Sequence, residues 1–295
     1  MIKSEQNAVA PGTLYLIATP IGNLSDISQR AIDILEQVDF ILCEDTRHSS
    51  ILLEHYNIHK KLVSYFAHNE ALRTDQFLPD LQSGQSAALI TDAGTPGISD
   101  PGSRLVDACH ESGITVCPVP GASAVVSAVS ASGFYQYTGF EFVAFFPRKS
   151  SERQALFQSF ASCSRLLVGY ESPQRILSLL DDLIAALGGE RRVCLCRELT
   201  KKFETITRTT AQKLRDQFAE TPCKGELCLV IEGVPEPQID NTCITDDAVR
   251  LIRMLQARSL SARDIRDIVS EFTGLQARAV YQYILANPVS GNEDS

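Results

Sequence analysis

The chain has 295 residues, and at roughly 150 residues per domain this length predicts about two domains. With 44% hydrophobic and 21% charged residues, the composition is that of a globular protein and excludes a disordered or fibrous one. The net charge of −9 argues against a surface that binds nucleic acid everywhere, although it does not exclude a local basic patch.

Cysteine usage and apolar runs indicate the compartment. Nine cysteines occur and no two are spaced as C-x-x-C, which favours reduced, buried thiols over disulfides or a zinc site. Residues 1–11 are polar and lack the apolar core of a secretory signal. The charge-free stretch 112–140 contains prolines, glycines and serines, so it cannot supply the ~20 consecutive apolar residues of a membrane span. We therefore predict a cytoplasmic protein without a membrane span.

The first half of the chain alternates apolar runs with amphipathic helical patterns. A helix is predicted from Asp26, where Asp26 and Gln29 have the spacing of a capping box. Apolar strands that alternate with helices form parallel sheets covered on both faces. Residues 12–137 are therefore predicted to form an N-terminal α/β domain, with strands over 13–19, 40–43, 87–91 and 115–119.

Residues 138–234 are predicted to form a second α/β domain. One clear helical pattern occurs, over 175–187. The link between the strands near 192–209 is short, which predicts antiparallel pairs and a mixed sheet. The predicted strands cover 143–146, 166–170, 192–197, 204–209 and 227–231.

The end of the chain is predicted to be a small helical tail over 241–286. A linker that contains prolines, 234–240, precedes it, and a disordered segment, 287–295, is expected to follow it. Ser261 and Asp264 give a cap signal, and Thr273 with Gly274 makes a tight turn. The predicted helices cover 246–258, 261–272 and 275–286, and the last two have helix-turn-helix spacing.

Glycine- and proline-rich loops follow three of the predicted N-terminal strands, at 19–24, 91–102 and 118–124. In a parallel sheet these loops all lie at the carboxyl edge, where open α/β folds bind ligands. The dinucleotide, P-loop, zincin and α/β-hydrolase motifs are all missing. Arg104 is the one cation between residues 91 and 131, which favours a small cationic or amphoteric ligand over a nucleoside triphosphate.

Eight segments stand in a fixed order along the chain, namely Leu16–Leu24, Glu44–Arg47, Asp92–Gly102, Pro120–Ala124, Phe146–Lys149, Tyr170–Pro173, Arg197–Lys201 and Lys224–Glu226. Together they resemble the motifs of the tetrapyrrole-methylase superfamily of S-adenosylmethionine-dependent methyltransferases, and within it those of the small-subunit ribosomal RNA methyltransferase I subfamily. The resemblance covers about 12–232. Tetrapyrrole members usually have Gly-Asp-Pro where this chain has Gly94-Thr95-Pro96, so no aspartate role is carried over to Thr95.

The resemblance implies two α/β lobes of the tetrapyrrole-methylase type, with S-adenosylmethionine folded into the cleft between them. It implies methylation of the ribose 2′-hydroxyl of a cytidine in the decoding region of 16S rRNA. The small ribosomal subunit is then the partner, and a homodimer is expected because the superfamily is commonly dimeric. The helical tail also resembles that of the RNA subfamily.

The cleft is expected to suit a sulfonium ion. Such an ion is better stabilised by carbonyl oxygens and aromatic faces than by lysines, and Tyr170 is a candidate aromatic wall. No metal site is predicted. The predicted donor-binding residues are Pro20, Ile21, Gly22, Thr95, Pro96, Gly97, Ile98, Gly121, Ser123, Ala124, Tyr170, Leu199, Glu226 and Leu227.

Methyl transfer to a ribose hydroxyl needs a base for the hydroxyl proton or a cation for the emerging alkoxide. Glu44, Asp45 and Arg47 follow the strand predicted over 40–43, so they are expected on the same side as the donor loops. Lys149 and Glu171 are the catalytic candidates from the second lobe.

Basic residues concentrate in the middle of the chain. Residues 1–137 carry 15 acidic and 7 basic residues, a net of −8, whereas residues 138–210 carry 8 and 11, a net of +3. Positive charge close to phosphates supplies most sequence-independent affinity for RNA. Phe145, Phe146 and Phe203 are expected to offer stacking surfaces for bases. The predicted RNA-binding residues are Arg148, Lys149, Arg153, Arg197, Lys201 and Lys202.

Two other functions stay open at this point. A methylase of small tetrapyrroles would use the same fold, and fold alone does not separate it from an RNA methyltransferase. A non-catalytic RNA-binding assembly factor is the second alternative, but such a protein would not need three preformed donor loops. The basic stretch and the helical tail favour RNA as the substrate.

Overall fold

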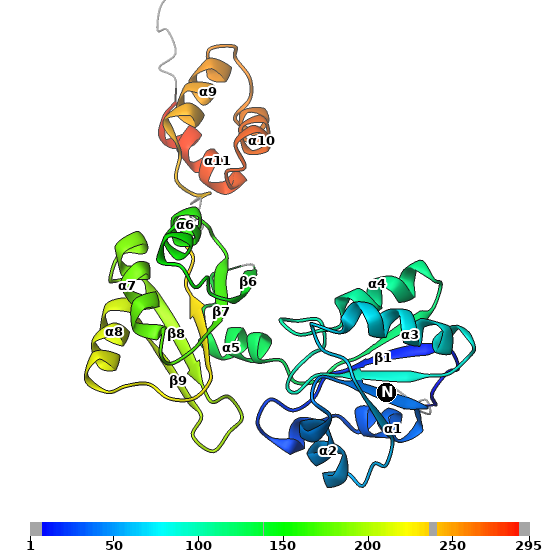
Figure 1. Cartoon of the computed structure of the whole chain (residues 1–295). Helices are drawn as coiled ribbons and strands as arrows, with labels where there is room; N and C mark the ends of the chain where they lie inside the picture. Colours follow the sequence, from blue (N-terminus) through cyan, green and yellow to red (C-terminus); the bar gives the residue numbers. More distant parts are fainter. Residues whose placement is uncertain (1–7, 138, 236–240, 289–295) are drawn as a thin grey trace, which may run out of the picture. The chain divides into compact units, whose positions relative to one another are not determined.

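The computed structural model describes residues 8–137, 139–235 and 241–288 (Figure 1). The chain divides into two compact units, Met1–Val234 and Pro235–Ser295. The first unit contains two five-stranded sheets, and the second consists of helices. Most of the predicted linker, 236–240, and most of the predicted disordered end, 289–295, lie outside the described residues. Within the described ranges, no helix is long and apolar enough to cross a bilayer.

The first sheet is parallel throughout, as the sequence predicts. Its strand order is β3-β2-β4-β1-β5. The sequence analysis missed β3, which is short and only partly buried and so lacks a continuous apolar run. The strands are β1 (Thr13–Ile17), β2 (Phe40–Cys43), β3 (Lys61–Ser64), β4 (Ala87–Ile90) and β5 (Thr115–Val119).

Helices cover both faces of this sheet. Side chains alternate along each strand, so Ile41 of β2 packs toward α1 (Gln29–Gln37) and α2 (Thr46–His55). Leu42 packs on the other face, toward α3 (Glu70–Gln82) and α4 (Ser103–Glu111). Figure 1 shows these two helical layers on opposite sides of the sheet.

The first helix begins later than the sequence predicts. Residues Leu24–Asp26 form a short 3-10 turn, and Asp26 does not cap the helix. Ser28 is the N-cap, and its hydroxyl accepts a hydrogen bond from the backbone N–H of Ala31 at 3.2 Å. The capping box predicted from Asp26 and Gln29 is therefore wrong, because a nearer serine satisfies the free N–H groups.

The second sheet is mixed, which confirms the predicted architecture. Its order is β6-β7-β10-β8-β9, with β6 and β7 parallel and the other pairs antiparallel. Its strands are β6 (Phe140–Phe145), β7 (Leu166–Glu171), β8 (Arg192–Arg197), β9 (Thr205–Thr210) and β10 (Leu227–Ile231).

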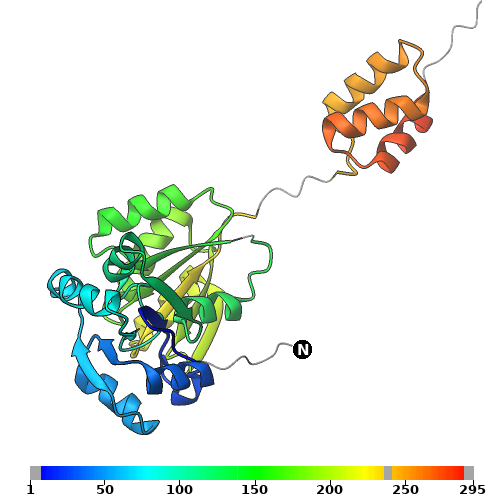
Figure 2. The same ribbon diagram turned by 90° about the vertical axis from the view of Figure 1, so that its right-hand side faces the viewer.

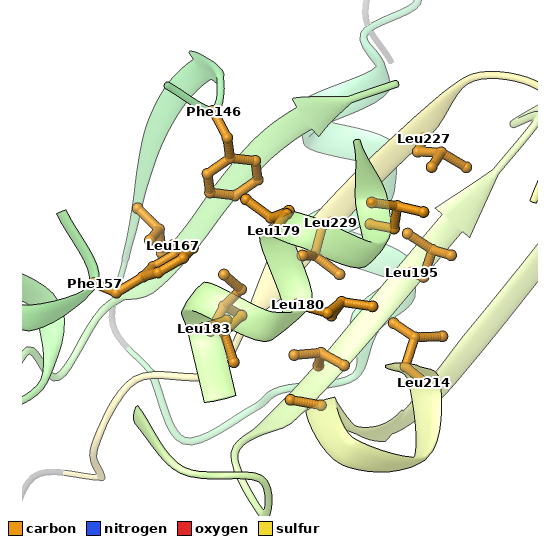
Figure 3. Close-up of a cluster of buried hydrophobic side chains, with 14 of the residues drawn as sticks. Phe146, Phe157, Leu167, Leu179, Leu180, Leu183, Leu195, Leu214, Leu227 and Leu229 are labelled. Atoms are coloured by element: carbon orange, nitrogen blue, oxygen red, sulfur yellow. The ribbon is translucent and has the colours of Figure 1, made fainter. Parts of the chain in front are cut away.

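Three helices cover one face of the second sheet, namely α6 (Ser150–Phe160), α7 (Ile176–Leu187) and α8 (Ala211–Glu220). Figure 3 shows the leucines of α7 packed over those of the sheet. Only α7 was predicted, because it is strongly apolar. The other two helices place few apolar side chains, such as Phe157 and Leu214, among many polar ones.

The opposite face is covered by α5 (Ala124–Ser132), which comes from the stretch assigned to the N-terminal domain. Its buried residues Val125 and Ala128 pack against Val168 of β7 and Val230 of β10. The sequence-based boundary at 138 therefore separates this helix from the sheet on which it packs.

The second unit holds α9 (Asp246–Gln256), α10 (Ala262–Thr273) and α11 (Ala277–Ala286) (Figure 2). Buried apolar side chains of these helices form a small core. Ser261 caps α10, as the sequence predicts, by accepting from the backbone N–H of Asp264 at 3.2 Å. Gly274 ends α10 with φ at 70°, a left-handed conformation that favours glycine. This turn joins α10 to α11 as expected.

Arg153 is buried inside the second lobe. Its Nε donates to Asp182 Oδ2 at 2.7 Å, and its Nη1 donates to the carbonyl of Arg148 at 2.8 Å. The two charged side chains are 5% and 9% exposed, so this guanidinium has no surface to offer to a phosphate. The sequence-based prediction of Arg153 as an RNA-binding residue is therefore wrong: the residue is a structural ion-pair partner.

Replacing Arg153 with alanine should lower the free energy of unfolding by about 3–5 kcal/mol, because Asp182 would stay buried without its counter-charge. Urea unfolding would measure this loss. Arg165→Ala is the control, since Arg165 pairs with Glu141 at the surface and its loss should change stability far less. Equal, small losses in both variants would contradict the structural role of the buried pair.

Candidate active site

A cavity of about 470 Å³ lies between the two sheets of the first unit. The loops after β1, β2 and β4 and the start of α5 form one wall. The ends of β6, β7 and β8 and the start of β10 form the other. The lining residues are Ile21, Glu44, Asp92, Ala93, Gly94, Thr95, Ile98, Ser99, Asp100, Ser123, Ala124, Phe145, Tyr170, Glu171, Ser172, Pro173, Cys196, Leu199, Gly225, Glu226, Leu227 and Cys228.

The three glycine- and proline-rich loops are tied into one surface. Thr19 and Gly94 exchange backbone hydrogen bonds of 2.8 and 3.0 Å, which join the first loop to the second. The buried Thr19 hydroxyl donates to the carbonyl of Thr91 at 2.9 Å. Thr95 Oγ1 donates to the carbonyl of Ala122 at 3.2 Å, which joins the second loop to the third. The loops are therefore fixed before any ligand enters.

Gly22 marks a close approach between the lobes. A Cβ atom at this position would lie 2.8 Å from Thr200 Oγ1 and 3.0 Å from the carbonyl oxygen of Leu199, and it would also meet the side chain of Lys201. Glycine is needed here for space, because any side chain would push the first loop away from the loop after β8.

The loop after β8 is rigid because its polar groups bond to one another. Lys201 Nζ donates to Glu198 at 3.1 Å and to Glu226 at 2.9 Å. Although partial burial lowers it, these two hydrogen bonds raise the pKa of Lys201 above its ordinary value. Glu198 and Thr200 both have positive φ, at 52° and 65°. Such strain persists only where the surrounding contacts enforce it.

A β-bulge decides where two adjacent phenylalanines point. The β6–β7 register shifts between Phe142 and Phe145, and Ala144 has φ at 55°. Phe145 is 60% exposed, lines the cavity and lies 5.6 Å from the ring of Tyr170. Phe146 is buried in the core of the second lobe (Figure 3), so its predicted role as a stacking surface is wrong.

Tyr170 forms an aromatic wall of the cavity, as expected from the sequence. Burial, followed by the neighbouring Cys228 and Asp100, raises the pKa of its phenol to about 12. The phenol is therefore neutral at physiological pH and contributes an uncharged ring face.

Glu171 lies at the cavity but is held by an arginine. Arg175 donates to its two carboxylate oxygens at 2.6 and 2.7 Å and to the carbonyl of Phe146 at 2.8 Å. This bidentate pair fixes the carboxylate and joins the end of β7 to the end of β6. Glu171 is thus better suited to positioning than to accepting a proton.

Three carboxylates crowd the wall formed by the first lobe. Burial first, and then the charges of Glu44 and Asp92, raise the pKa of Asp100 to about 6. Burial and the charge of Asp92 also raise the pKa of Glu44. Asp92 accepts a hydrogen bond from the backbone N–H of Asp45 at 3.2 Å. This side of the cavity is therefore strongly negative.

Three of the catalytic candidates lie outside the cavity lining. Arg47 is 90% exposed, and its Nη2 donates to Asp45 Oδ2 at 2.7 Å. Hydrogen bonds from the Arg47 side chain and backbone lower the pKa of Asp45 to about 2. Lys149 is 77% exposed and pairs with Glu152 at 3.0 Å. Glu44 and Glu171 are the two candidates that reach the cavity.

The predicted donor-binding residues divide into two groups. Those that line the cavity are Ile21, Thr95, Ile98, Ser123, Ala124, Tyr170, Leu199, Glu226 and Leu227. Those that do not are Pro20, Gly22, Pro96, Gly97 and Gly121. Pro96 and Gly97 instead line a second cavity of about 350 Å³ behind the loop.

Several lining residues escaped sequence reasoning. Asp92 and Asp100 lie in the second glycine- and proline-rich loop, but the sequence analysis assigns only residues 95–98 of that loop to the donor. Cys196 and Cys228 face the cavity because alternate residues of β8 and β10 point to the same side, and these two are direct cross-strand partners. The period of two along each strand could have placed them.

The predicted RNA-binding residues also differ in availability. Arg148, Lys149 and Lys202 are exposed. Arg197 instead donates to the carbonyls of Lys224 and Phe203, at 3.1 and 3.2 Å, and so stabilises the loop.

The arrangement suits a small cationic ligand. Five carboxylates and no lysine or arginine stand among the lining residues. A positive charge in this partly buried space would be stabilised, whereas a polyphosphate would be repelled. No cluster of three or more metal-ligating side chains occurs in the part of the chain that the structure describes.

The chain is similar to known proteins in sequence and in fold. A family model described as Tetrapyrrole (Corrin/Porphyrin) Methylases matches residues 13–215. Ribosomal RNA small subunit methyltransferase I of Haemophilus influenzae is 45% identical over 278 residues, 94% of this chain and 97% of that protein. Its namesake in Pasteurella multocida is 46% identical over 92% of this chain and 96% of that protein. The crystal structure of uroporphyrin-III-C-methyltransferase from Thermus thermophilus has the same fold, with a TM-score of 0.54 and 21% identity over 74% of this chain and 94% of that one.

Replacing Asp100 with asparagine should stabilise the protein above pH 6. In the wild type the carboxyl titrates at about 6 when folded and near 3.8 when unfolded, so stability from this group is lost as pH rises between these values. The variant escapes this loss, which we expect to be about 1–2 kcal/mol after screening by solvent. Urea unfolding from pH 4 to pH 8 would measure the difference. An advantage that does not grow between pH 4 and pH 6 would contradict the raised pKa.

Proposed function

The chain belongs to the tetrapyrrole methylase family, and from this premise we propose that it is an S-adenosylmethionine-dependent methyltransferase of 16S ribosomal RNA. The observation that carries the proposal is its similarity over almost the full length to proteins named ribosomal RNA small subunit methyltransferase I. The acceptor in this proposal is the ribose 2′-hydroxyl of a cytidine in the decoding region.

The cavity is suited to the methyl donor. S-adenosylmethionine supplies an activated methyl group on a positively charged sulfur. The acidic lining complements that charge, and Tyr170 offers a ring face. The residues proposed to hold the donor are Ile21, Thr95, Ile98, Ser123, Ala124, Leu199 and Leu227.

The exposed part of the loop after β8 is the proposed contact for unpaired RNA. Phe203 is 65% exposed, and Lys202 Nζ lies 5.5 Å from its ring centroid. Leu199 of the same loop lines the cavity, so RNA stacked on Phe203 would lie close to the reaction. Arg148 and Lys149 extend this proposed basic surface, whereas Lys201 is engaged within the loop.

The proposal also includes a role for the second unit, an oligomeric state and a compartment. The helices of the second unit would assist RNA binding, since they have helix-turn-helix spacing. The active form would be a homodimer in the cytoplasm.

The function is tested with small ribosomal subunits from a strain that lacks this gene. The purified protein and labelled donor should add one methyl group to 16S rRNA, located by mass spectrometry on the ribose of a decoding-region cytidine. Transfer to the base alone would contradict the proposed acceptor atom. Transfer to uroporphyrinogen, with none to the subunit, would contradict RNA as the substrate.

Gly22→Ala should weaken donor binding by about tenfold or more, because the added methyl group would push apart the two loops that close the cavity. Isothermal titration calorimetry would measure the dissociation constant. Gly139→Ala serves as the control, since its Cβ would meet no atom closer than 3.8 Å. Unchanged affinity in a folded Gly22→Ala protein would remove this contact from the donor site.

Lys202 and Phe203 should contribute to RNA affinity in different ways. Lys202→Ala should lower the salt slope of single-stranded RNA binding by about 0.7, because one phosphate contact is lost. Phe203→Ala should weaken binding by about 5–100-fold with the slope unchanged, because stacking releases no counterions. Fluorescence anisotropy over a range of salt concentrations would separate the two, with Lys213→Ala on α8 as the control. An unaltered slope in Lys202→Ala would place the RNA on another surface.

A further inference from the structure

Five carboxylates line the cavity, and four of them are held by other groups. Glu44 accepts from the backbone of Asp92, and Asp92 accepts from the backbone of Asp45. Glu171 is paired with Arg175, and Glu226 with Lys201. Asp100 differs from them, since only burial and the charges of Glu44 and Asp92 act on its carboxylate among the described residues.

The backbone holds Asp100 firmly although its side chain is free. Ser99, just before it, has φ at 65°, and Pro101 follows it. The backbone N–H of Gly97 donates to the carbonyl of Pro101 at 3.1 Å, and the N–H of Gly102 donates to Glu70 Oε1 at 2.8 Å. The loop is thus fixed on both sides of Asp100 while its carboxylate keeps its lone pairs for a ligand.

We propose that Asp100 is the general base of the methyl transfer, an inference that rests on the proposed function. The acceptor oxygen forms a bond to the methyl carbon, the carbon–sulfur bond breaks with its electron pair passing to sulfur, and the hydroxyl proton passes to the Asp100 carboxylate. The protonated carboxyl then releases this proton to water. One proton is released for each methyl group transferred, so atoms and charge balance and no other reactant is needed.

The surroundings of Asp100 suit this task. The groups that face it are Glu44 and Asp92 from its own lobe and Tyr170 from the other. Burial first, and then the charges of these two carboxylates, disfavour the charged form of Asp100 and make it a stronger base, which is nevertheless ionised at neutral pH. Glu171 and Glu226 already accept hydrogen bonds from Arg175 and Lys201, so their oxygens are less available to a hydroxyl proton.

The test measures kcat/KM on the small subunit against pH in the wild type and in Asp100→Asn. The wild-type rate should fall below pH 6, and the variant should lose about 10²–10⁴-fold and show no such fall. Asp100→Glu should keep a pH-dependent fall in rate on the acidic side, which is the acidic limb of the profile. Glu44→Gln should move the limb to lower pH, because it removes a charge that disfavours ionisation of Asp100. Asp107→Asn on α4, outside this cavity, is the control for the substitution itself.

Two further measurements distinguish the possible causes of a loss of activity in Asp100→Asn. Calorimetry should give Asp100→Asn a donor dissociation constant within about tenfold of the wild type, because four of the five lining carboxylates remain to complement the sulfonium charge. A variant that no longer binds donor would assign Asp100 to donor binding and overturn its role as base. The titration of Asp100 obtained from unfolding should match the limb in the rate, and a mismatch beyond about one pH unit would also overturn it. Unaltered turnover in Asp100→Asn, beside an active wild type, would overturn this inference alone, whereas an inactive wild type would overturn the proposed function with it.

Discussion

Repulsion between carboxylates at the edge of the parallel sheet is the constraint on which the site depends. Glu44, Asp92 and Asp100 follow strands β2 and β4, which are neighbours in the sheet, so the topology forces them together. No lysine or arginine lining the cavity relieves this repulsion. The repulsion is partly compensated because backbone N–H groups donate hydrogen bonds to two of the three acids, Glu44 and Asp92. The unrelieved charge is available to bind a cation and to accept a proton.

The larger features of the fold could be predicted from the sequence because they depend on periodicity. Continuous apolar runs predicted β2 and β10 to the residue, and the bounds of β5 and β8 were also predicted correctly. Elements with weak patterns were missed, namely β3, α5, α6 and α8. The spacing of residues also did not show which of two nearby side chains caps a helix: Ser28, rather than Asp26, caps α1.

The site could be predicted by loop but not by side chain. Sequence motifs identified the loops whose residues line the cavity, because glycine and proline mark fixed turns. They could not show that Arg153 has a partner inside the fold, since Asp182 lies far away in the sequence. Lys201 has one near partner, Glu198, but its second partner, Glu226, is also remote in the sequence. Nor could they show that a bulge sends Phe145 to the cavity and Phe146 to the core. Asp100 became distinctive only when the partners of every neighbouring acid were known.

Helix α5 gives the two lobes a shared element. Its first residue, Ala124, lines the cavity, and the body of the helix fills one face of the second sheet. A chain divided after residue 137 would leave Val168, Cys194 and Val230 facing water, because their cover would remain with the other piece. The two lobes are therefore not exchangeable modules. A recombinant chain that keeps the second sheet covered must have its junction before α5, and that junction falls in the third loop of the site.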